Sequence, residues 1–312
     1  MLPLNALMIV YIVEGAFVLI VNIPSIFVIY SVSRLSRSKD IIALGGLCLA
    51  DISHSLAFFV AGIMRKHKID IGLEHELVEQ WTCYFVAFDI MFFVGYQFTG
   101  LMTMVVSLDR LLAVTCPLMH ATLRTRHYLL MIGLQLVYCV AIYFIALPFQ
   151  MSSTLLVSGL CFTSTGFYRP IWSYLLSFRI ITIGTSVLLY VPIVWKTRKL
   201  LAGSKKPAVA SRFNVKKQRL ARLNVTIGLA SISGLVLLFV PDILILFDLF
   251  GVAAFDVIFY IIALNKCVVN VFFFTFRHRE LRTAFMRPFL KHFGHELSHV
   301  AKVKMSKHVE CP

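Results

Sequence analysis

The chain has 312 residues, of which 59% are hydrophobic and 14% charged, and its formal net charge is +15. Soluble domains are roughly half apolar and a quarter charged, and a soluble protein of this size could not bury the excess. The composition therefore excludes an ordinary soluble domain and indicates an integral membrane protein. It also disfavours a nucleic-acid partner, because the positive charges lie between apolar stretches and not on a polar domain.

Seven stretches are long and apolar enough to cross a bilayer as helices, which takes roughly 20 residues each. None shows the alternating pattern of barrel strands. We therefore predict an all-α bundle of seven transmembrane helices within residues 1–290 and a short basic tail over 291–312. In chain order, the predicted spans are Leu7–Tyr30, Ile41–Met64, Tyr84–Leu108, Tyr128–Phe149, Ile171–Trp195, Leu223–Phe247 and Val252–Phe276.

The ends of these spans give a predicted orientation. The first span lacks the basic leader and small-residue cleavage site of a signal peptide, so we interpret it as a retained helix. With the amino terminus outside, 23 of the 30 Lys and Arg residues fall in the cytoplasmic segments and four in the outer loops. Membrane proteins carry such an excess on the cytoplasmic side. We expect an extracellular amino terminus and a basic cytoplasmic face.

This topology sorts the seven cysteines. Only Cys83 and Cys161 face the outside, where a disulfide persists. The two residues either form a bridge, which would join the top of the third helix to the loop after the fourth, or remain free thiols.

Polar residues inside the predicted helices are a guide to function, because charge at membrane depth is costly. The first helix contains Asn22 and the second Asp51, the third ends in Asp109-Arg110-Leu111, and the seventh contains Asn270 to Phe274. This set, with Cys83 and Cys161, resembles the rhodopsin-like G-protein-coupled receptors. Asp109-Arg110-Leu111 stands where that family has Asp-Arg-Tyr, and Asn270 to Phe274 where it has Asn-Pro-x-x-Tyr.

Within that family the chain looks most like the nematode serpentine chemoreceptors of class sx. The stretches that carry this likeness are Leu35–Lys39, Tyr96-Gln97, Ser107–Val114 and Phe276–Phe285.

The resemblance implies a signalling switch made of Asp109, Arg110, Leu111, Asn270 and Phe274. In this interpretation Asp109 holds the Arg110 guanidinium, which is charged at all relevant pH values, until a G protein inserts. The alternative is a plain interfacial ion pair. No Asp or Glu occurs from residue 196 to 240, so the sixth helix cannot supply an acidic partner for Arg110, and we expect measurable basal signalling.

The resemblance also implies a polar cluster midway through the bundle, of the kind that often binds sodium. Its members would be Asn22, Asp51, Thr99 and Asn270. Lys266 lies four residues before Asn270 and so shares its helix face. We expect the Lys266 ammonium to pair with Asp51 in place of sodium, the alternative being a lysine that extends to the interface. A retinal-binding opsin is disfavoured, because the opsin lysine would fall at Leu264.

The remaining predicted features concern the outer half of the bundle. Pro241 should bend the sixth helix, since it removes a helical hydrogen bond, and Phe239 stands where the family usually has Trp. Phe92 stands where aminergic receptors have an aspartate, so a biogenic amine is not expected. The resemblance places a ligand pocket between helices 3, 5, 6 and 7, and its candidate residues are Asp89, Phe92, Phe93, Tyr96, Arg179, Asp242 and Phe259. The alternative for each is a core or helix-packing role, and Arg179 could simply pair with Asp242.

Residues 277–290 have apolar positions at helical spacing, which predicts an amphipathic helix on the cytoplasmic membrane surface. The resemblance implies a heterotrimeric G protein and an extracellular small molecule or short peptide as partners, with membrane lipid around the bundle. It implies location in the plasma membrane, and leaves open a sensory-neuron cilium and a receptor dimer. We expect no cofactor and no enzymatic activity. A transporter or channel is the alternative class, but the sequence shows no inverted repeat.

Overall fold

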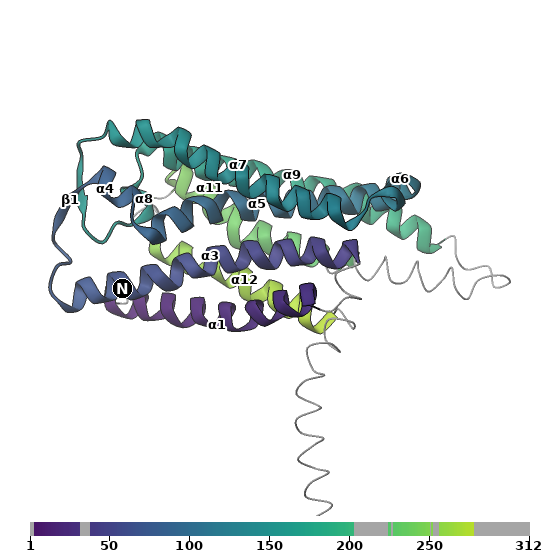
Figure 1. Ribbon diagram of the computed structural model, residues 1–312, viewed down its shortest axis with the longest axis horizontal. Coiled ribbons are helices and arrows are strands. Elements are labelled where there is room, and N and C mark those ends of the chain that lie inside the picture. Colours follow the sequence, from purple (N-terminus) through teal and green to yellow (C-terminus); the bar gives the residue numbers. More distant parts are fainter. Residues whose placement is uncertain are drawn as a thin grey trace, which may run out of the picture.

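The computed structural model describes residues 3–31, 38–202, 224–225, 227–249, 251 and 256–277. Long helices run side by side along one axis of the molecule (Figure 1). They are α1 (Leu4–Ser31), α3 (Lys39–Asp70), α5 (Ala87–Thr115), α7 (Thr125–Met151), α9 (Arg169–Ala202) and α12 (Asp256–Arg277). A further long helix includes residues 224–225 and 227–234 and continues through the π-helical η1 (Leu235–Phe239) into α11 (Val240–Leu246).

Six of these helices are long and apolar enough to cross a membrane, and α12 contributes a shorter apolar stretch, Val257–Asn270. The helices at the edge of the bundle expose large apolar side chains, such as Ile20 and Phe27 on α1 and Val137 and Phe144 on α7. A water-soluble protein of this size would hide such side chains, whereas lipid covers them at no cost. The all-α, seven-helix architecture predicted from the sequence is confirmed.

Several helices extend beyond the predicted spans. α3 continues past Met64 to Asp70, where Lys66 and Asp70 pair four residues apart, and α5 continues past Leu108 to Thr115. Apolar character marks only the part of a helix that contacts lipid, while backbone hydrogen bonding continues into polar surroundings. The third span also begins later than predicted. Tyr84 ends the separate helix α4 (Gln80–Tyr84), and extended backbone at Val86 precedes α5.

One end of the bundle is covered by short elements that the all-α prediction did not include. Strand β1 (Leu77–Glu79) pairs antiparallel with β2 (Leu156–Ser158), with Val78 opposite Val157. These strands lie with α4 and α8 (Thr163–Gly166) at the end where α1 begins (Figure 1). The strands are only three residues long, so apolar periodicity could not reveal them. We call the segment from Leu77 to Tyr84, together with Leu156 to Gly166, the lid.

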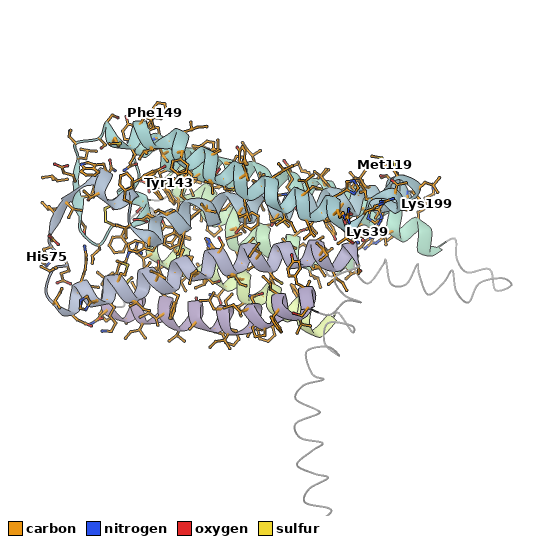
Figure 2. The ribbon with its side chains drawn as sticks, viewed as in Figure 1. Lys39, His75, Met119, Tyr143, Phe149 and Lys199 are labelled. Atoms are coloured by element: carbon orange, nitrogen blue, oxygen red, sulfur yellow. A yellow bond between two sulfur atoms is a disulfide. The ribbon has the colours of Figure 1, made fainter. Side chains whose placement is uncertain are left out.

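The opposite end carries the short helix α6 (Pro117–Thr122), the first residues of α3 and the end of α9. Figure 2 places Lys39, Met119 and Lys199 there and His75 at the lid end. We call this the basic end. The predicted amphipathic helix over 277–290, apart from its first residue, and the tail over 291–312 lie outside the described residues. Phe274 belongs to α12, but its side chain also lies outside the described part.

Helices α3 and α5 form the centre of the bundle, since more than half of the apolar, membrane-spanning stretch of each helix is buried. α3 packs closely against α1. A Cβ atom at Gly15 would lie 3.0 Å from the backbone nitrogen of Phe59, so only glycine permits this approach. The central position of α3 and α5 brings their polar residues, among them Asp51 and Asp109, to the inside of the bundle.

Candidate functional site

At the basic end, Asp109 and Arg110 form a buried ion pair. Arg110 Nε donates to Asp109 Oδ2 at 2.9 Å, and Nη2 donates to the same oxygen. The exposed fraction is 1% for the Arg110 side chain and 4% for that of Asp109. Charge-assisted bonds of this kind are about twice as strong as neutral ones. The pair holds the guanidinium against its own helix.

Two residues that the sequence did not single out complete this pair. The Tyr128 hydroxyl, at the start of α7, donates to Asp109 Oδ1, and His120 Nε2 of α6 lies 3.0 Å from the same oxygen. Lys39 of α3 in turn donates to the His120 carbonyl. Asp109 therefore joins α5, α6 and α7. The Asp109-Arg110-Leu111 motif covers only residues that are adjacent in the sequence, so it could not indicate that Tyr128 and His120 contact Asp109.

The other predicted residues of the switch lie near this pair or deeper in the bundle. Leu111 is half-buried and packs against the apolar cluster that contains Val114 and Tyr190, where a tyrosine would present a hydroxyl.

Near this end, α9 is joined to the helix that follows by uncharged groups. Tyr190 donates to the Asn224 carbonyl, and Asn224 Nδ2 donates to Thr197 Oγ1 at 2.9 Å.

Midway through the bundle, Asp51 is the centre of a buried polar cluster. Lys266 Nζ donates to Asp51 Oδ1 at 2.9 Å, and Asn270 Nδ2 donates to Oδ2 at 2.9 Å. Cys267 Sγ lies 3.4 Å from Oδ1, a contact absent from the sequence prediction. The cluster adjoins a cavity of about 10 Å³, which holds about one water molecule.

Two predicted members of the cluster are buried but have other contacts. Asn22 Nδ2 donates to the Val18 carbonyl of its own helix at 3.1 Å. The Thr99 carbonyl accepts from Thr103, while Thr99 Oγ1 has no hydrogen-bond partner within the described ranges. Family positions alone do not fix which side chains meet across helices. Each polar group bonds to the nearest acceptor, which is often the carbonyl four residues earlier in its own helix.

In the outer half, Arg179 of α9 and Asp242 of α11 form a second buried ion pair. Arg179 Nε donates to Asp242 Oδ2 at 2.6 Å, and Nη2 donates to Oδ1. The guanidinium also stacks on the ring of Tyr96, with its carbon 3.8 Å from the ring centre. The pairing given as an alternative in the sequence analysis is therefore present.

Aromatic rings surround this pair on the side of α3. His54 lies between the rings of Phe58, Phe92 and Tyr96, at centroid distances of 5.0, 6.1 and 5.4 Å. Its two ring nitrogens are buried, and neither has a hydrogen-bond partner in the described part of the chain. No spacing pattern in the sequence marks His54, so it could not be recognised there as a neighbour of these residues.

Three predicted pocket residues lie elsewhere. Phe93 packs against Tyr143 and Phe167 on the α7 side, at centroid distances of 5.3 and 5.8 Å. Asp89 is buried beneath the lid, where its Oδ2 would lie 3.8 Å from a Cβ at Gly166. Phe259 is half-buried and packs against the apolar cluster that contains Phe92, Phe93 and Tyr260. Of the seven candidates, Phe92, Tyr96, Arg179 and Asp242 come together with His54.

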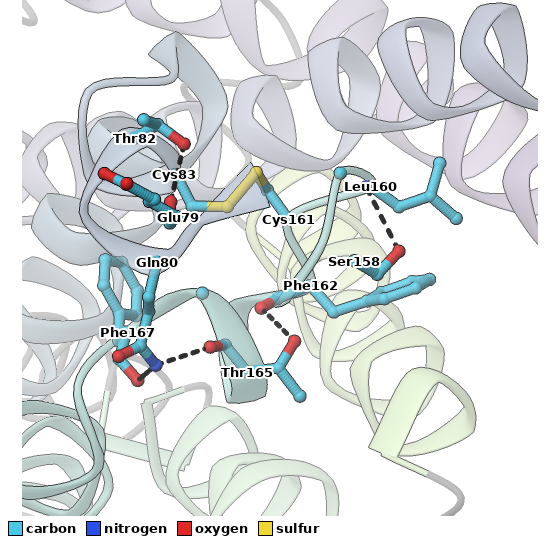
Figure 3. The surroundings of a disulfide bond; sticks show 12 residues. Glu79, Gln80, Thr82, Cys83, Ser158, Leu160, Cys161, Phe162, Thr165 and Phe167 are labelled. Carbon is cyan, nitrogen blue, oxygen red and sulfur yellow. Dashed lines mark hydrogen bonds between the residues drawn. A yellow bond between two sulfur atoms is a disulfide. The ribbon is translucent and has the colours of Figure 1, made fainter. Parts of the chain in front are cut away.

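The two segments of the lid are joined to each other by a disulfide, and the lid is held to α3 by Arg65. Cys83 and Cys161 form a disulfide, which confirms the predicted bridge and excludes two free thiols (Figure 3). Arg65, at the end of α3, is buried and donates to the carbonyls of Leu160 and Cys161 at 2.9 and 2.6 Å. Gln80 adds bonds to the carbonyls of Thr165 and Phe167, at 2.7 and 3.0 Å.

Helix 6, which here means the described residues between 224 and 246, changes its winding close to the proline. The π-helical turn η1 ends at Phe239, and Pro241 lies in the first turn of α11. Proline cannot donate to the backbone four residues back, so the extra residue of a π turn accommodates it. Phe239 packs against α9, where a Cβ at Gly184 would lie 3.0 Å from Phe239 Cε2.

Comparison with known proteins decides the family. The family model of the serpentine type 7TM GPCR chemoreceptor Srsx matches residues 16–289. The chain belongs to the Srsx family. The match covers the second half of α1, all the later helices described above and the disulfide lid. A comparison with curated proteins finds no match.

Membership makes this Srsx protein a multi-pass membrane receptor of the chemosensory GPCR type, a receptor class and not an enzyme class. The family accounts for the seven helices and the bridge. The family match by itself describes no individual contacts, and the Asp51–Lys266 pair, the Arg179–Asp242 pair and the His120 and Tyr128 contacts to Asp109 come from the structure of this Srsx chain.

Proposed function

We propose that this Srsx receptor detects an extracellular small molecule or short peptide and activates a heterotrimeric G protein at its basic end. The observation that carries the proposal is the buried Asp109–Arg110 pair, held by groups from α6 and α7. A buried guanidinium that pairs with the carboxylate next to it in the chain can exchange that carboxylate for a new acceptor once the cleft beside it opens. A carbonyl-rich helix end, such as a G-protein carboxyl terminus, suits a guanidinium with five donors.

The proposed mechanism is a shift between two populations. In the resting state, helix 6 packs on α9 through Phe239 and Gly184 and through Tyr190 and Asn224. Ligand binding favours the state in which helix 6 moves outward, and the G protein binds that state. The π turn and Pro241 provide a point at which helix 6 can bend.

We propose that the amino terminus and the lid are extracellular and that the basic end faces the cytoplasm. The distribution of Lys and Arg and the placement of the disulfide in the lid both support this orientation. The plasma membrane is the proposed location, with the sensory-neuron cilium as the site in a chemosensory cell. Receptor dimers are a further proposal, and they do not bear on the mechanism.

We also propose that Lys266 performs the charge compensation that sodium supplies in relatives. Its ammonium occupies one Asp51 oxygen, and Asn270 occupies the other. A sodium ion beside this cluster would meet the Lys266 charge at close range, which opposes its binding.

The proposal is tested by expressing the receptor in cells that carry a promiscuous G protein and screening small molecules and peptides for a calcium response. Arg110→Ala should abolish the response while surface expression persists. Arg126→Ala is the matched control, because Arg126 is an exposed arginine at the same end of the bundle. Equal responses of Arg110→Ala and the native receptor would contradict the proposed switch.

Basal activity provides a second readout that needs no ligand. Since helix 6 has no acidic residue for Arg110 through residue 240, the native receptor should signal above mock-transfected cells, in proportion to its surface expression. A tag at the amino terminus, stained on intact cells, reports that expression and tests the orientation at the same time. Staining only after permeabilisation would reverse the proposed topology.

A further inference from the structure

We infer that the Arg179–Asp242 ion pair is the resting-state lock of helix 6, and that the ligand opens it with a carboxylate that takes the place of Asp242 on Arg179. The inference deepens the proposed function, on which it rests, because it names the chemical class of the ligand and the contact that the ligand breaks.

The pair joins two helices that must separate if helix 6 moves. Arg179 lies on α9 and Asp242 on α11, and both donor groups that reach across belong to one guanidinium. Both side chains are at least 98% buried. Separating such a pair without a substitute leaves two buried charges uncompensated, so the closed arrangement is strongly favoured.

The position of the pair along helix 6 supports its role as a lock. Asp242 directly follows Pro241, and the π turn η1 ends three residues before it. An ion pair this close to the bend holds helix 6 against α9 where the bend occurs, so we infer that outward movement of helix 6 requires the pair to open. The same helix has no acidic residue at its cytoplasmic end. An ion pair that restrains helix 6 is therefore present in the outer half of the bundle, whereas helix 6 has no acidic residue to form one at the basic end.

The two partners are not held equally. Arg179 stacks on Tyr96, a fully buried residue of α5, and α9 packs along α5, where a Cβ at Gly100 would contact Thr182. Asp242 has only the Arg179 bonds among the contacts described for it. When the pair breaks, Arg179 stays with α5 and Asp242 leaves with helix 6.

This asymmetry identifies the charge of the ligand. A carboxylate matches the guanidinium fork in the same two-bond geometry as Asp242 and leaves Arg179 in its place on Tyr96. An ammonium would instead have to displace Arg179 and would then lie beside it as a second cation. The rings of Trp172 and Tyr260, 6.3 Å apart, and the ring of Tyr96 beside Trp172 give an aromatic or apolar body a surface to pack on.

The lock is tested by measuring helix 6 directly, which needs no G protein. Spin labels are placed on the native, exposed Cys116 at the end of α5 and on Val225→Cys at the start of helix 6, with Cys311→Ser to remove a second reactive site. The other free cysteines of the described chain, Cys48, Cys139 and Cys267, are buried. Pulsed electron paramagnetic resonance of the full receptor in nanodiscs then reports the distance across the cytoplasmic cleft.

Asp242→Asn should raise the ratio of the long-distance to the short-distance population by roughly tenfold, the scale of a typical coupling between sites. Asp70→Asn is the matched control, because it removes a carboxylate from the exposed Lys66–Asp70 pair, and it should leave the ratio unchanged. The exchange Arg179→Asp with Asp242→Arg should restore the short distance. Arg179→Gln removes the other partner of the pair, should lengthen the distance in the same way, and serves if Asp242→Asn cannot be purified. An unchanged distance in Asp242→Asn, or in Arg179→Gln used in its place, overturns the lock.

The ligand class is tested with three probes of one shape, which are phenylacetate, phenylacetamide and phenethylamine at millimolar concentration. Phenylacetate alone should lengthen the distance in the native receptor, and it should have no effect on Arg179→Gln. A response to phenethylamine, or to none of the three probes, overturns the carboxylate assignment. If the distance changes as expected but no G protein responds in cells, the lock stands and the proposed signalling function fails.

Discussion

The Lys266 ammonium lies 2.9 Å from the Asp51 carboxylate, although the two residues are 215 positions apart in the chain. The pair joins α12 to α3 in the middle of the bundle, and both side chains are at most 3% exposed. Asn270 takes the second carboxylate oxygen, so each partner of Asp51 comes from the same face of α12. Much of the attachment of the last helix to the bundle therefore depends on one acidic residue.

Lys266→Met should destabilise the receptor by roughly 3–5 kcal/mol, because it leaves the Asp51 carboxylate buried without its cation. Thermal unfolding of purified receptor in detergent measures the change. Adding Asp51→Asn to this variant should recover much of the loss, since neither charge then remains. Lys66→Met, at an exposed pair, is the control and should change the unfolding temperature little.

Sodium should have little effect on the native receptor. Replacing choline chloride by sodium chloride at constant ionic strength is expected to leave its unfolding temperature unchanged, because Lys266 already neutralises Asp51. Lys266→Met should become more stable in sodium than in choline. A sodium-dependent rise in the native receptor would show that the ammonium does not replace the ion.

Tyr128→Phe should raise basal signalling. The change removes the hydroxyl that donates to Asp109 and leaves the ring in place, so it weakens the hold on the carboxylate that restrains Arg110. The loss of one hydrogen bond to a charged group is worth about 1.5–3 kcal/mol. Reporter output per receptor at the cell surface measures the effect. Tyr138→Phe, an exposed tyrosine of the same helix, should leave basal output as it is.

Arg65→Gln should loosen the lid. Arg65 donates to two lid carbonyls and lies over the rings of Phe88 and Phe162, each 4.8 Å away, and a glutamine cannot reproduce all four contacts. We expect faster hydrogen exchange in residues 156–166 and a weaker ligand response, with the disulfide still formed. Arg169→Gln, which changes an exposed arginine at the same end, should leave exchange in that segment unchanged.

Asp89→Asn should stabilise the receptor by about 1 kcal/mol or more. Among the described residues, neither carboxylate oxygen of Asp89 has a hydrogen-bond donor, and a neutral amide costs less to bury than a charge. Asp242→Asn should have the opposite effect, since it breaks a paired charge. Thermal unfolding of the two variants side by side gives the comparison. A marked loss of stability in Asp89→Asn would reveal a partner for its carboxylate.

The sequence was sufficient for those features that one segment decides alone. Apolar stretches of about 20 residues predict spanning helices because lipid requires every backbone group to bond within its own segment. The bridge followed from the predicted topology, which left Cys83 and Cys161 as the two cysteines in an oxidising compartment. The Asp109–Arg110 pair also followed, because its members are neighbours in the chain.

Most contacts between segments could not be predicted in this way, although the sequence did suggest the Lys266–Asp51 pair and offered the Arg179–Asp242 pair as an alternative. The rotation of each helix about its axis decides which side chains meet. It brings His120 and Tyr128 to Asp109, turns Asp89 beneath the lid and places Asp242 opposite Arg179. That rotation is set by the packing of all the helices at once, including close approaches such as Gly15 to Phe59. The sequence by itself determined that this chain is a seven-helix membrane protein with a charged pair at one end. Only the tertiary structure decided which buried charges meet, because pairing across helices depends on distances that no segment specifies alone.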